Sequence, residues 1–446
     1  MSRKENPYRQ ILRRDYPEPL IALLAFILGL WLWNHYTAEP AGYAPGTEAM
    51  AMVKIDRDLR LAETMSGDPA WLRWFAGAAT PNEVRTRARR VLEELDDAGA
   101  MSAAGFEAYA ILVAADTGEP AHAVLARAMP GRPPPDFGDW SDALASGTGT
   151  WWQAAWVESV SGMHPPIQPW QTIFNDGSIR LRNRAIAARS AVWLVALAGV
   201  GFIPRATMLL ARALFSKHRG YAAAWSPQLG LFVFLAAVLA WIGFSLALEM
   251  GLAAVPDMHP GLVTLLDAGA RLLPALIAIG LLFRRPGHAA RVTGLFGDVP
   301  VRTVLGLFAM LVLFDLPLRW ATGQQEIIDP AAGISAHEAG LWGLVFAVVG
   351  ACLVAPVSEE ILYRGVLFRA LANQLGVATG AVLSSAVFAA LHFYGLYGLL
   401  SVAVFGFSCA LLYAATRSLA AVIALHILYN SAIKLPEWLF YQAPLG

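Results

Sequence analysis

The chain has little charge for its length, and this scarcity argues against an ordinary soluble protein. Only 15% of its 446 residues are charged, while 57% are hydrophobic; an average soluble domain has roughly 25% charged residues. The apolar residues are gathered into runs long enough to cross a bilayer, which takes about 20 residues. The sequence therefore predicts a polytopic membrane protein.

Cysteine and net charge are also scarce. Cys352 and Cys409 are the two cysteines, and both lie in predicted membrane helices. Such a pair favours packing over a disulfide or a cysteine-based metal site. The formal net charge is zero, and the basic residues are scattered through short loops at helix ends. That scatter argues against a nucleic-acid partner.

The neutral total hides an uneven distribution of charge. Between Thr37 and Gly177 there are 19 acidic and 10 basic residues. The rest of the chain therefore carries a matching basic excess. The pattern predicts an acidic soluble domain attached to a basic membrane part.

The hydrophobic runs predict the fold class. The run from Leu20 to Trp33 follows a basic stretch, ends in aromatic residues and lacks a clear small-x-small cleavage site, so we expect an uncleaved membrane anchor. Eight further runs follow at residues 186–203, 229–248, 262–283, 303–319, 341–358, 378–396, 398–415 and 418–433. We expect an all-α polytopic membrane protein, with about nine transmembrane helices and a mostly helical extracytoplasmic domain after the first span.

These runs divide the chain into five parts. We expect a cytoplasmic N-terminus with the first span, an extracytoplasmic helical domain, accessory membrane helices, a catalytic membrane core and a C-terminal tail. Their ranges are residues 1–36, 37–185, 186–340, 341–435 and 436–446.

Orientation follows from lysine and arginine, which gather in the loops of one side. The positive-inside rule places the N-terminus in the cytoplasm and the acidic domain outside, and we expect a multi-pass protein of a bacterial inner membrane. Four arginines at the outer entrance of the second span oppose this orientation: Arg180, Arg182, Arg184 and Arg189.

The soluble domain has clear helix signals. In "TPNEVRTRARRVLEELDDAG", Thr80 is a predicted N-cap, Pro81 takes the first helical position and Glu83 closes a capping box, with Gly99 as the stop. Five tryptophans follow in a segment without clear periodicity, and they favour a local core: Trp140, Trp151, Trp152, Trp156 and Trp170.

Two charged pairs within the membrane runs have the spacing of self-neutralising helical pairs. Asp267 and Arg271 are four residues apart, as are Asp315 and Arg319. Residues at this spacing are neighbours on a helix surface. We expect both pairs to be structural.

The stretch "PVSEEILYRGVLFRAL" differs because it holds two adjacent carboxylates. Glu360 can pair with Arg364 four residues later. Glu359 lies about 100° around the helix from Glu360, so it has no arginine on its own face. A charge near hydrocarbon costs about 2.5 to 3.5 kcal/mol, and an unpaired one is a functional candidate.

Two later membrane runs add polar residues at helical spacing. "FAALH" places Phe388 and His392 on one face, and "HILYN" does the same for His426 and Asn430. Each residue alone could be a packing or bridging side chain. Together with Glu359 they supply a general base for water and hydrogen-bond donors for an oxyanion, the requirements of amide hydrolysis.

Two questions stay open at the level of the residues. Glu359, His392 and His426 are also a ligand set suited to catalytic zinc, although we favour a site with neither metal nor another cofactor. Counting at 1.5 Å per residue puts Glu359 near the cytoplasmic face, His426 roughly 12 Å deep and His392 roughly 18 to 22 Å deep. Catalysis would require these depths to converge.

The three motifs EExxxR, FxxxH and HxxxN resemble those of the CPBP family (CAAX protease and bacteriocin-processing, also called ABI). The resemblance covers about residues 341 to 435. It implies an intramembrane endopeptidase in which Glu359 and His392 activate water. His426 and Asn430 would then hold the oxyanion, and Glu360 and Arg364, with Phe388 nearby, would support them.

The implied substrate is a membrane protein, a peptide or a prenylated protein within the lipid bilayer, and the sequence does not separate these classes. The soluble domain could bind an extracytoplasmic protein partner. The competing hypothesis is a non-catalytic immunity, receptor or scaffold protein with the same fold. An intact set of glutamate, histidines and asparagine weighs against it, because a scaffold has no use for buried charge.

Overall fold

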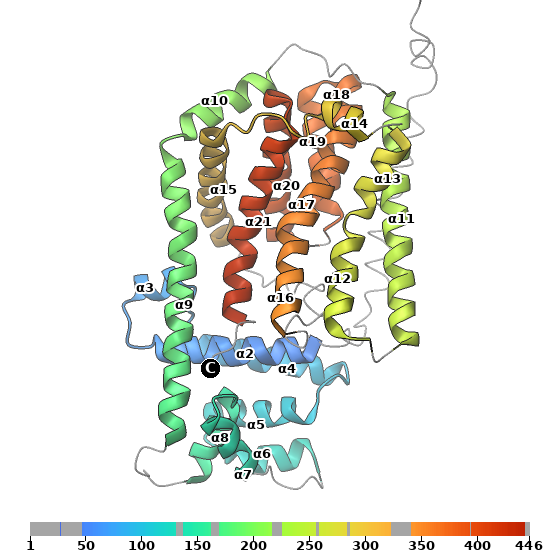
Figure 1. Ribbon diagram of the computed structural model, residues 1–446. Helices are drawn as coiled ribbons and strands as arrows, with labels where there is room; N and C mark the ends of the chain where they lie inside the picture. Colours follow the sequence, from blue (N-terminus) through green and yellow to red (C-terminus); the bar gives the residue numbers. More distant parts are fainter. Residues whose placement is uncertain are drawn as a thin grey trace, which may run out of the picture. The chain divides into compact units, whose positions relative to one another are not determined.

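The computed structural model describes residue 27 and residues 47–130, 137–161, 169–215, 225–255, 258–282, 286–322, 340–392 and 394–441. All regular structure within these ranges is helical (Figure 1). The predicted N-terminal anchor lies outside the described residues except for Ile27. The chain forms two compact units. The first holds residues 1–38, 192–328 and 338–434, and the second holds residues 39–191, 329–337 and 435–446.

The second unit is the predicted soluble domain. Its helices are α2 (Thr47–Thr64), α3 (Ala70–Ala76), α4 (Pro81–Asp97), α5 (Ala103–Thr117), α6 (Ala121–Ala128), α7 (Phe137–Ala145), α8 (Trp151–Ser161) and most of α9 (Pro169–Val200). The predicted capping box is present, since the backbone N–H of Glu83 donates to the Thr80 hydroxyl and that of Thr80 donates to the Glu83 carboxylate. Gly99 follows α4 with a φ of 65°.

The tryptophans form part of the core of this unit, as predicted. Trp151, Trp152 and Trp156 are buried with residues of α2, α4, α5 and α6. The Trp156 indole N–H donates to the carbonyl of Glu107 at 2.9 Å, so the buried polar end of this ring is satisfied. Trp140 packs against the same cluster, and the side chain of Trp170 lies outside the described set.

Helix α9 explains the four arginines that opposed the predicted orientation. It begins at Pro169, so the hydrophobic run from residue 186 is only its second part. All four arginines precede Val192 and belong to the soluble unit. Arg182 holds Asp68 by two bonds, of 2.7 and 2.9 Å, and this contact lowers the pKa of Asp68. Arg182 is therefore bound to an acidic residue of its own unit, while the orientation of the chain in the membrane stays a prediction.

Among the residues that the structure describes, six helical stretches are long and apolar enough to span a membrane. They are Pro227–Leu248, Gly261–Leu282, Val301–Arg319, Trp342–Leu375, Leu396–Thr416 and Leu419–Tyr441. Gln171–Val200 and Ile203–Leu214 pass the same test as a pair bent by 69°, and Val377–Ala390 is a shorter apolar helix. The chain is thus a multi-pass integral membrane protein. The count of nine spans stays a prediction, because the first lies outside the described residues.

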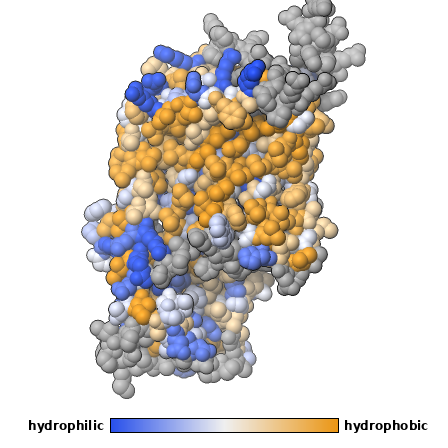
Figure 2. Space-filling view, in the orientation of Figure 1, coloured by the Kyte–Doolittle hydropathy of each residue, from blue (hydrophilic) through white to orange (hydrophobic). Residues whose placement is uncertain are grey.

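The surface of the first unit agrees with a bilayer environment. Large apolar side chains are exposed along its helices, among them Leu194, Phe232, Leu239, Trp241 and Leu276. Figure 2 shows a broad hydrophobic band across the face in view. Lipid tails rather than water therefore cover this surface.

The remaining helices of this unit are α10 (Ile203–Leu214), α11 (Pro227–Ala254), α12 (Pro260–Ala270), α13 (Leu273–Leu282), α14 (Pro286–Thr293), α15 (Val301–Thr322), α19 (Val377–Ala390), α20 (Leu396–Thr416) and α21 (Leu419–Tyr441). The long stretch between α15 and α19 is α16 (Gly340–Val349), the π-helical η4 (Gly350–Val354), α17 (Ala355–Glu359), the π-helical η5 (Glu360–Phe368) and α18 (Arg369–Leu375). Phe368 and Phe388 are fully buried among these helices.

The long helix does not end where the hydrophobic run ends. Trp342–Leu375 is one stretch of 34 residues, and Glu359 stands at its middle. The hydrophobic run stopped at residue 358 because two charged residues follow it. The helix continues through them, and Glu360 is buried beside Arg364. Glu359 is therefore remote from both ends of the helix, while its depth below the cytoplasmic face stays a prediction.

A glycine turn brings the second motif to a matching height. Gly376 has a φ of 87° and joins α18 to α19, and the two helices pack on each other. Glu359 precedes this turn by 17 residues and His392 follows it by 16. In a helical hairpin, residues equally far from the turn lie at similar heights, so Glu359 and His392 lie at similar heights along this hairpin.

Candidate functional site

The site is built around a buried ion pair. Arg364 Nη1 lies 2.7 Å from Glu360 Oε1, and both side chains are essentially inaccessible, at 1% and 0% exposure. Arg364 Nη2 also donates to the carbonyl of Gly406 on α20 at 3.2 Å. The pair predicted from the spacing of four residues is therefore present, and it ties the long helix to α20.

His426 on α21 lies between the two glutamates. Its Nδ1 is 2.7 Å from Glu360 Oε1, and its Nε2 is 3.8 Å from Glu359 Oε2. Because a carboxylate paired with arginine only accepts hydrogen bonds, Nδ1 carries the proton and Nε2 faces Glu359. Glu359 is the accessible member of the group, with 29% of its side chain exposed.

The His392 side chain bonds to a backbone carbonyl near the end of its own helix. Its Nδ1 lies 2.6 Å from the carbonyl of Phe388, which leaves Nε2 for other contacts. The interactions of the described residues include no direct contact between Glu359 and His392. Phe388 packs between the motifs, with ring centroids 4.6 Å from His392 and 6.1 Å from His426.

Asn430 lies one helical turn beyond His426, but it does not bond either glutamate. Its Nδ2 donates to the carbonyl of Ala351 at 3.0 Å. That carbonyl belongs to the π-helical segment η4. The structure thus gathers the first, second and third motifs around one place in the membrane unit.

Three side chains at the site carried no motif signal in the sequence. Phe405 lies 4.8 Å from the His426 ring and stacks on Tyr429 at 4.6 Å. The Tyr429 hydroxyl is 3.1 Å from that of Ser401. Aromatic and serine residues are common in membrane helices, so no spacing rule in a single sequence would have selected them.

The two accessory ion pairs are also present. Arg271 is 2.9 Å from Asp267, and Arg319 is 2.6 Å from Asp315. Asp315 in addition accepts the hydroxyl of Tyr397. These pairs belong to α12 and α15 and contact neither glutamate of the first motif, in agreement with a structural role.

Gly406 gives the first prediction, because it occupies the point where Arg364 and Phe388 meet. A Cβ there would lie 3.1 Å from Phe388 and 3.3 Å from Arg364 Nη2. The Arg364 guanidinium carbon stands 4.5 Å from the centre of the Phe388 ring. Gly406→Ala should therefore displace both side chains and lower the thermal stability by about 1–3 kcal/mol.

The control for Gly406→Ala is Gly243→Ala on α11, where no atom lies within 4 Å of the added Cβ. That variant should melt at or slightly above the wild-type temperature, because alanine favours a helix. Thermal denaturation of both proteins in the same detergent makes the comparison. Equal melting temperatures for the two variants would contradict the packing described around Arg364.

The residues proposed as zinc ligands do not form a metal site in this arrangement. Across the described ranges, no three His, Cys, Asp or Glu side chains are placed to hold one metal ion.

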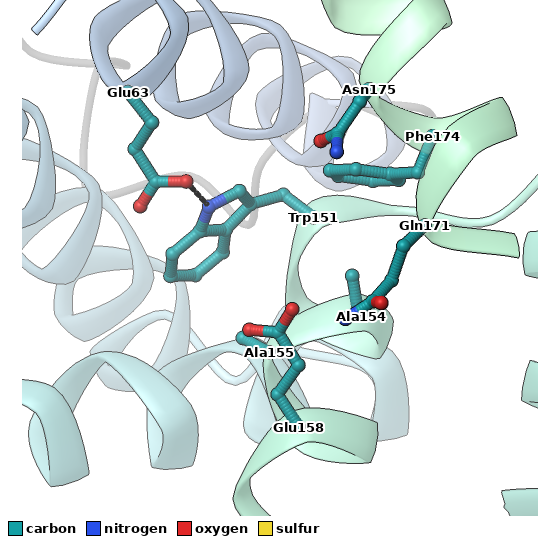
Figure 3. Close-up of a pocket in the computed structure, with 8 residues that line it drawn as sticks. All are labelled: Glu63, Trp151, Ala154, Ala155, Glu158, Gln171, Phe174 and Asn175. Atoms are coloured by element: carbon teal, nitrogen blue, oxygen red, sulfur yellow. Dashed lines mark hydrogen bonds between the residues drawn. The ribbon is translucent and has the colours of Figure 1, made fainter. Parts of the chain in front are cut away.

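A separate pocket lies in the soluble unit, with a volume of about 350 Å³. Figure 3 shows Glu63 and Trp151 on one side and Phe174, Asn175, Gln171 and Glu158 around the rest. The Trp151 indole donates to Glu63 at 2.7 Å. Partial burial raises the pKa of Glu63, and the nearby Glu158 adds to this effect. The three motifs are absent from this unit, so the pocket is not part of the candidate peptidase site.

Comparison with known proteins supports the resemblance drawn from the three motifs. Residues 341–432 match the family described as Type II CAAX prenyl endopeptidase Rce1-like. Searches of curated proteins and of solved structures gave no match. The matched segment begins with α16 and ends within α21, so it contains all seven residues of the motifs. Residues 341–432 are thus similar to the CAAX protease (CPBP) family, in agreement with the three motifs.

Proposed function

We propose that the protein is an intramembrane endopeptidase that hydrolyses a peptide bond of a membrane-associated or lipidated protein, with Glu359 activating the water. One observation carries the proposal. A partly accessible carboxylate stands at the middle of an apolar 34-residue helix, beside a buried network of Glu360, Arg364 and His426. A charged carboxylate in an apolar segment costs free energy of folding, and a role in catalysis explains why the protein retains it there.

The buried network would orient the histidine. Glu360 is fixed by Arg364 and accepts the Nδ1 proton of His426, so the other nitrogen points at Glu359. A carboxylate behind a histidine sets both the tautomer and the angle of the ring. The supporting role that we propose for Glu360 and Arg364 is the one that the family resemblance implies.

In the first step, Glu359 removes a proton from a water molecule while the water oxygen attacks the carbonyl carbon of the peptide. The carbonyl oxygen becomes an oxyanion. His392 has Nε2 available to position the water, because its Nδ1 is occupied. A general base of this kind contributes typically 10²- to 10⁴-fold to the rate.

In the second step, the C–N bond breaks and the leaving nitrogen takes the proton that Glu359 removed. We give His426 the role of passing this proton on, rather than the oxyanion role that the resemblance implies, because its Nδ1 proton is directed at Glu360 and its Nε2 lies 3.8 Å from the Glu359 carboxylate. Asn430 has a second amide hydrogen besides the one bonded to Ala351, and this hydrogen can donate to the oxyanion. The oxyanion electrons re-form the carbonyl, and the products are a new carboxyl group and a new amino group, which exchange a proton to become carboxylate and ammonium.

The substrate class can be tested with purified protein in lipid nanodiscs. A peptide with a C-terminal CAAX sequence is supplied with and without a prenyl group, and release of the last three residues is measured by mass spectrometry. Cleavage that requires the prenyl group would support a CAAX-type substrate. Cleavage of other membrane peptides alone would support the endopeptidase with a different substrate, and cleavage of none would favour a non-catalytic protein.

Metal removal gives a further prediction. We expect treatment with a strong chelator, followed by buffer exchange, to leave the cleavage rate within about twofold of the untreated protein. The reason is that no three His, Cys, Asp or Glu side chains among the described residues are placed to hold one metal ion. Loss of activity on chelation and its recovery with zinc would overturn the water mechanism proposed for Glu359.

A further inference from the structure

Pro356 interrupts the hydrogen-bond ladder of the long helix three residues before Glu359. The π-helical segment η4 ends where the backbone N–H of Ala355 donates to the carbonyl of Gly350, five residues back. In this register the next N–H would serve Ala351. The next residue is Pro356, which has no N–H.

The carbonyl left by the proline is the one that Asn430 binds. Asn430 Nδ2 donates to Ala351 O at 3.0 Å, and Pro356 itself is buried. A carbonyl inside the membrane needs a donor, since hydrocarbon offers none. The side chain on α21 therefore replaces a backbone donor that the long helix lacks.

This bond has a consequence for the candidate site. Asn430 and His426 are one turn apart on α21, and each is tied to the long helix, His426 through Glu360 and Asn430 through Ala351. Two ties on the same face fix the rotation of α21 at the site. One amide hydrogen of Asn430 is held by the carbonyl, which fixes the direction of the other.

We propose that Pro356 is a positioning residue: by withholding an N–H from Ala351, it makes that carbonyl the anchor of the Asn430 amide. The catalytic part of this inference rests on the proposed function, while the structural part does not. A Pro356→Ala variant would supply the missing N–H, and the helix would satisfy Ala351 from its own backbone. Asn430 would then lose its anchor while the long helix remained intact.

A thermal-stability cycle tests the structural part without any substrate. Asn430→Leu keeps the shape but removes the donor, so in the wild-type background it should lower the Tm by about 2–4 °C. In the Pro356→Ala background the same change should shift the Tm by less than about 1 °C. Equal shifts in both backgrounds would overturn the anchor. Asn430→Ala replaces the leucine variant if that protein does not accumulate.

Kinetics on the cleaved peptide test the catalytic part. Pro356→Ala should lower kcat about tenfold with KM unchanged. Asn430→Leu should itself lower kcat about 100-fold, and adding Pro356→Ala to that protein should have little further effect. The control is Pro317→Ala, which removes another proline from inside a membrane helix, at an exposed position of α15. An unchanged kcat for Pro356→Ala would overturn the positioning role. If the wild-type protein cleaves no peptide but the two substitutions are coupled in the stability cycle, the bond between Asn430 and Ala351 is supported. The proposed function and the catalytic role of that bond are then both wrong.

Discussion

Glu359→Gln should abolish peptide-bond cleavage while the protein reaches its normal level in the membrane. Glutamine has nearly the same shape as glutamate, and the carboxylate it replaces is partly exposed and lies 3.8 Å from Nε2 of His426. The variant therefore leaves no buried charge without a partner. It does remove the group that accepts the proton of water, so we expect at least a 100-fold loss of kcat.

The matched control for this substitution is Glu63→Gln in the soluble unit, which changes the same residue type away from the motifs. Both variants are compared with wild type by quantitative immunoblot of membranes and by cleavage of one reporter peptide. The control should keep the wild-type rate. A Glu359→Gln protein that cleaves at more than about a tenth of the wild-type rate would contradict the role of general base.

Arg364→Ala should instead reduce the amount of folded protein. The guanidinium is the ion-pair partner of Glu360, and both groups are buried. The second oxygen of Glu360, Oε2, already has no hydrogen-bond partner among the described residues. Removing one partner of a buried pair costs about 3–5 kcal/mol, which is a large part of the 5–15 kcal/mol that holds a typical protein folded.

The control for Arg364→Ala is Arg271→Ala, which breaks a pair of the same spacing on α12. There the two side chains are about one third exposed, so the loss should be within about 1 kcal/mol. Membrane abundance and Tm in detergent distinguish the two variants. Adding Glu360→Gln to Arg364→Ala should restore part of the lost stability, because it removes the stranded charge. Equal abundance of the two arginine variants would contradict the buried network.

Local features of the fold could be predicted from the sequence because they depend on near neighbours. Four of these features join residues that are three or four positions apart in a helix. They are the capping box of Thr80 and Glu83 and the ion pairs of Glu360, Asp267 and Asp315. Hydrophobic runs likewise located most of the membrane helices. Each of these depends on helix geometry alone.

The remaining features depend on contacts between distant segments. Counting from the end of a hydrophobic run ended the membrane helix before Glu359, because the sequence alone does not show that Glu360 is buried against both Arg364 and His426. The tie between His426 and Glu360 joins residues 66 positions apart, and that between Asn430 and Ala351 joins residues 79 apart. The second tie also needs a π-helical turn, which hydrophobic periodicity does not reveal.

The most direct test of the proposed function compares new peptide termini in membranes of the native host that express either wild type or Glu359→Gln at equal levels. Amino-terminal labelling and mass spectrometry identify the cleaved bonds. We predict termini that appear only with the wild-type protein, in proteins that are lipidated or embedded in the membrane. Identical sets of termini would contradict the proposed peptidase and favour a binding or immunity protein with the same fold.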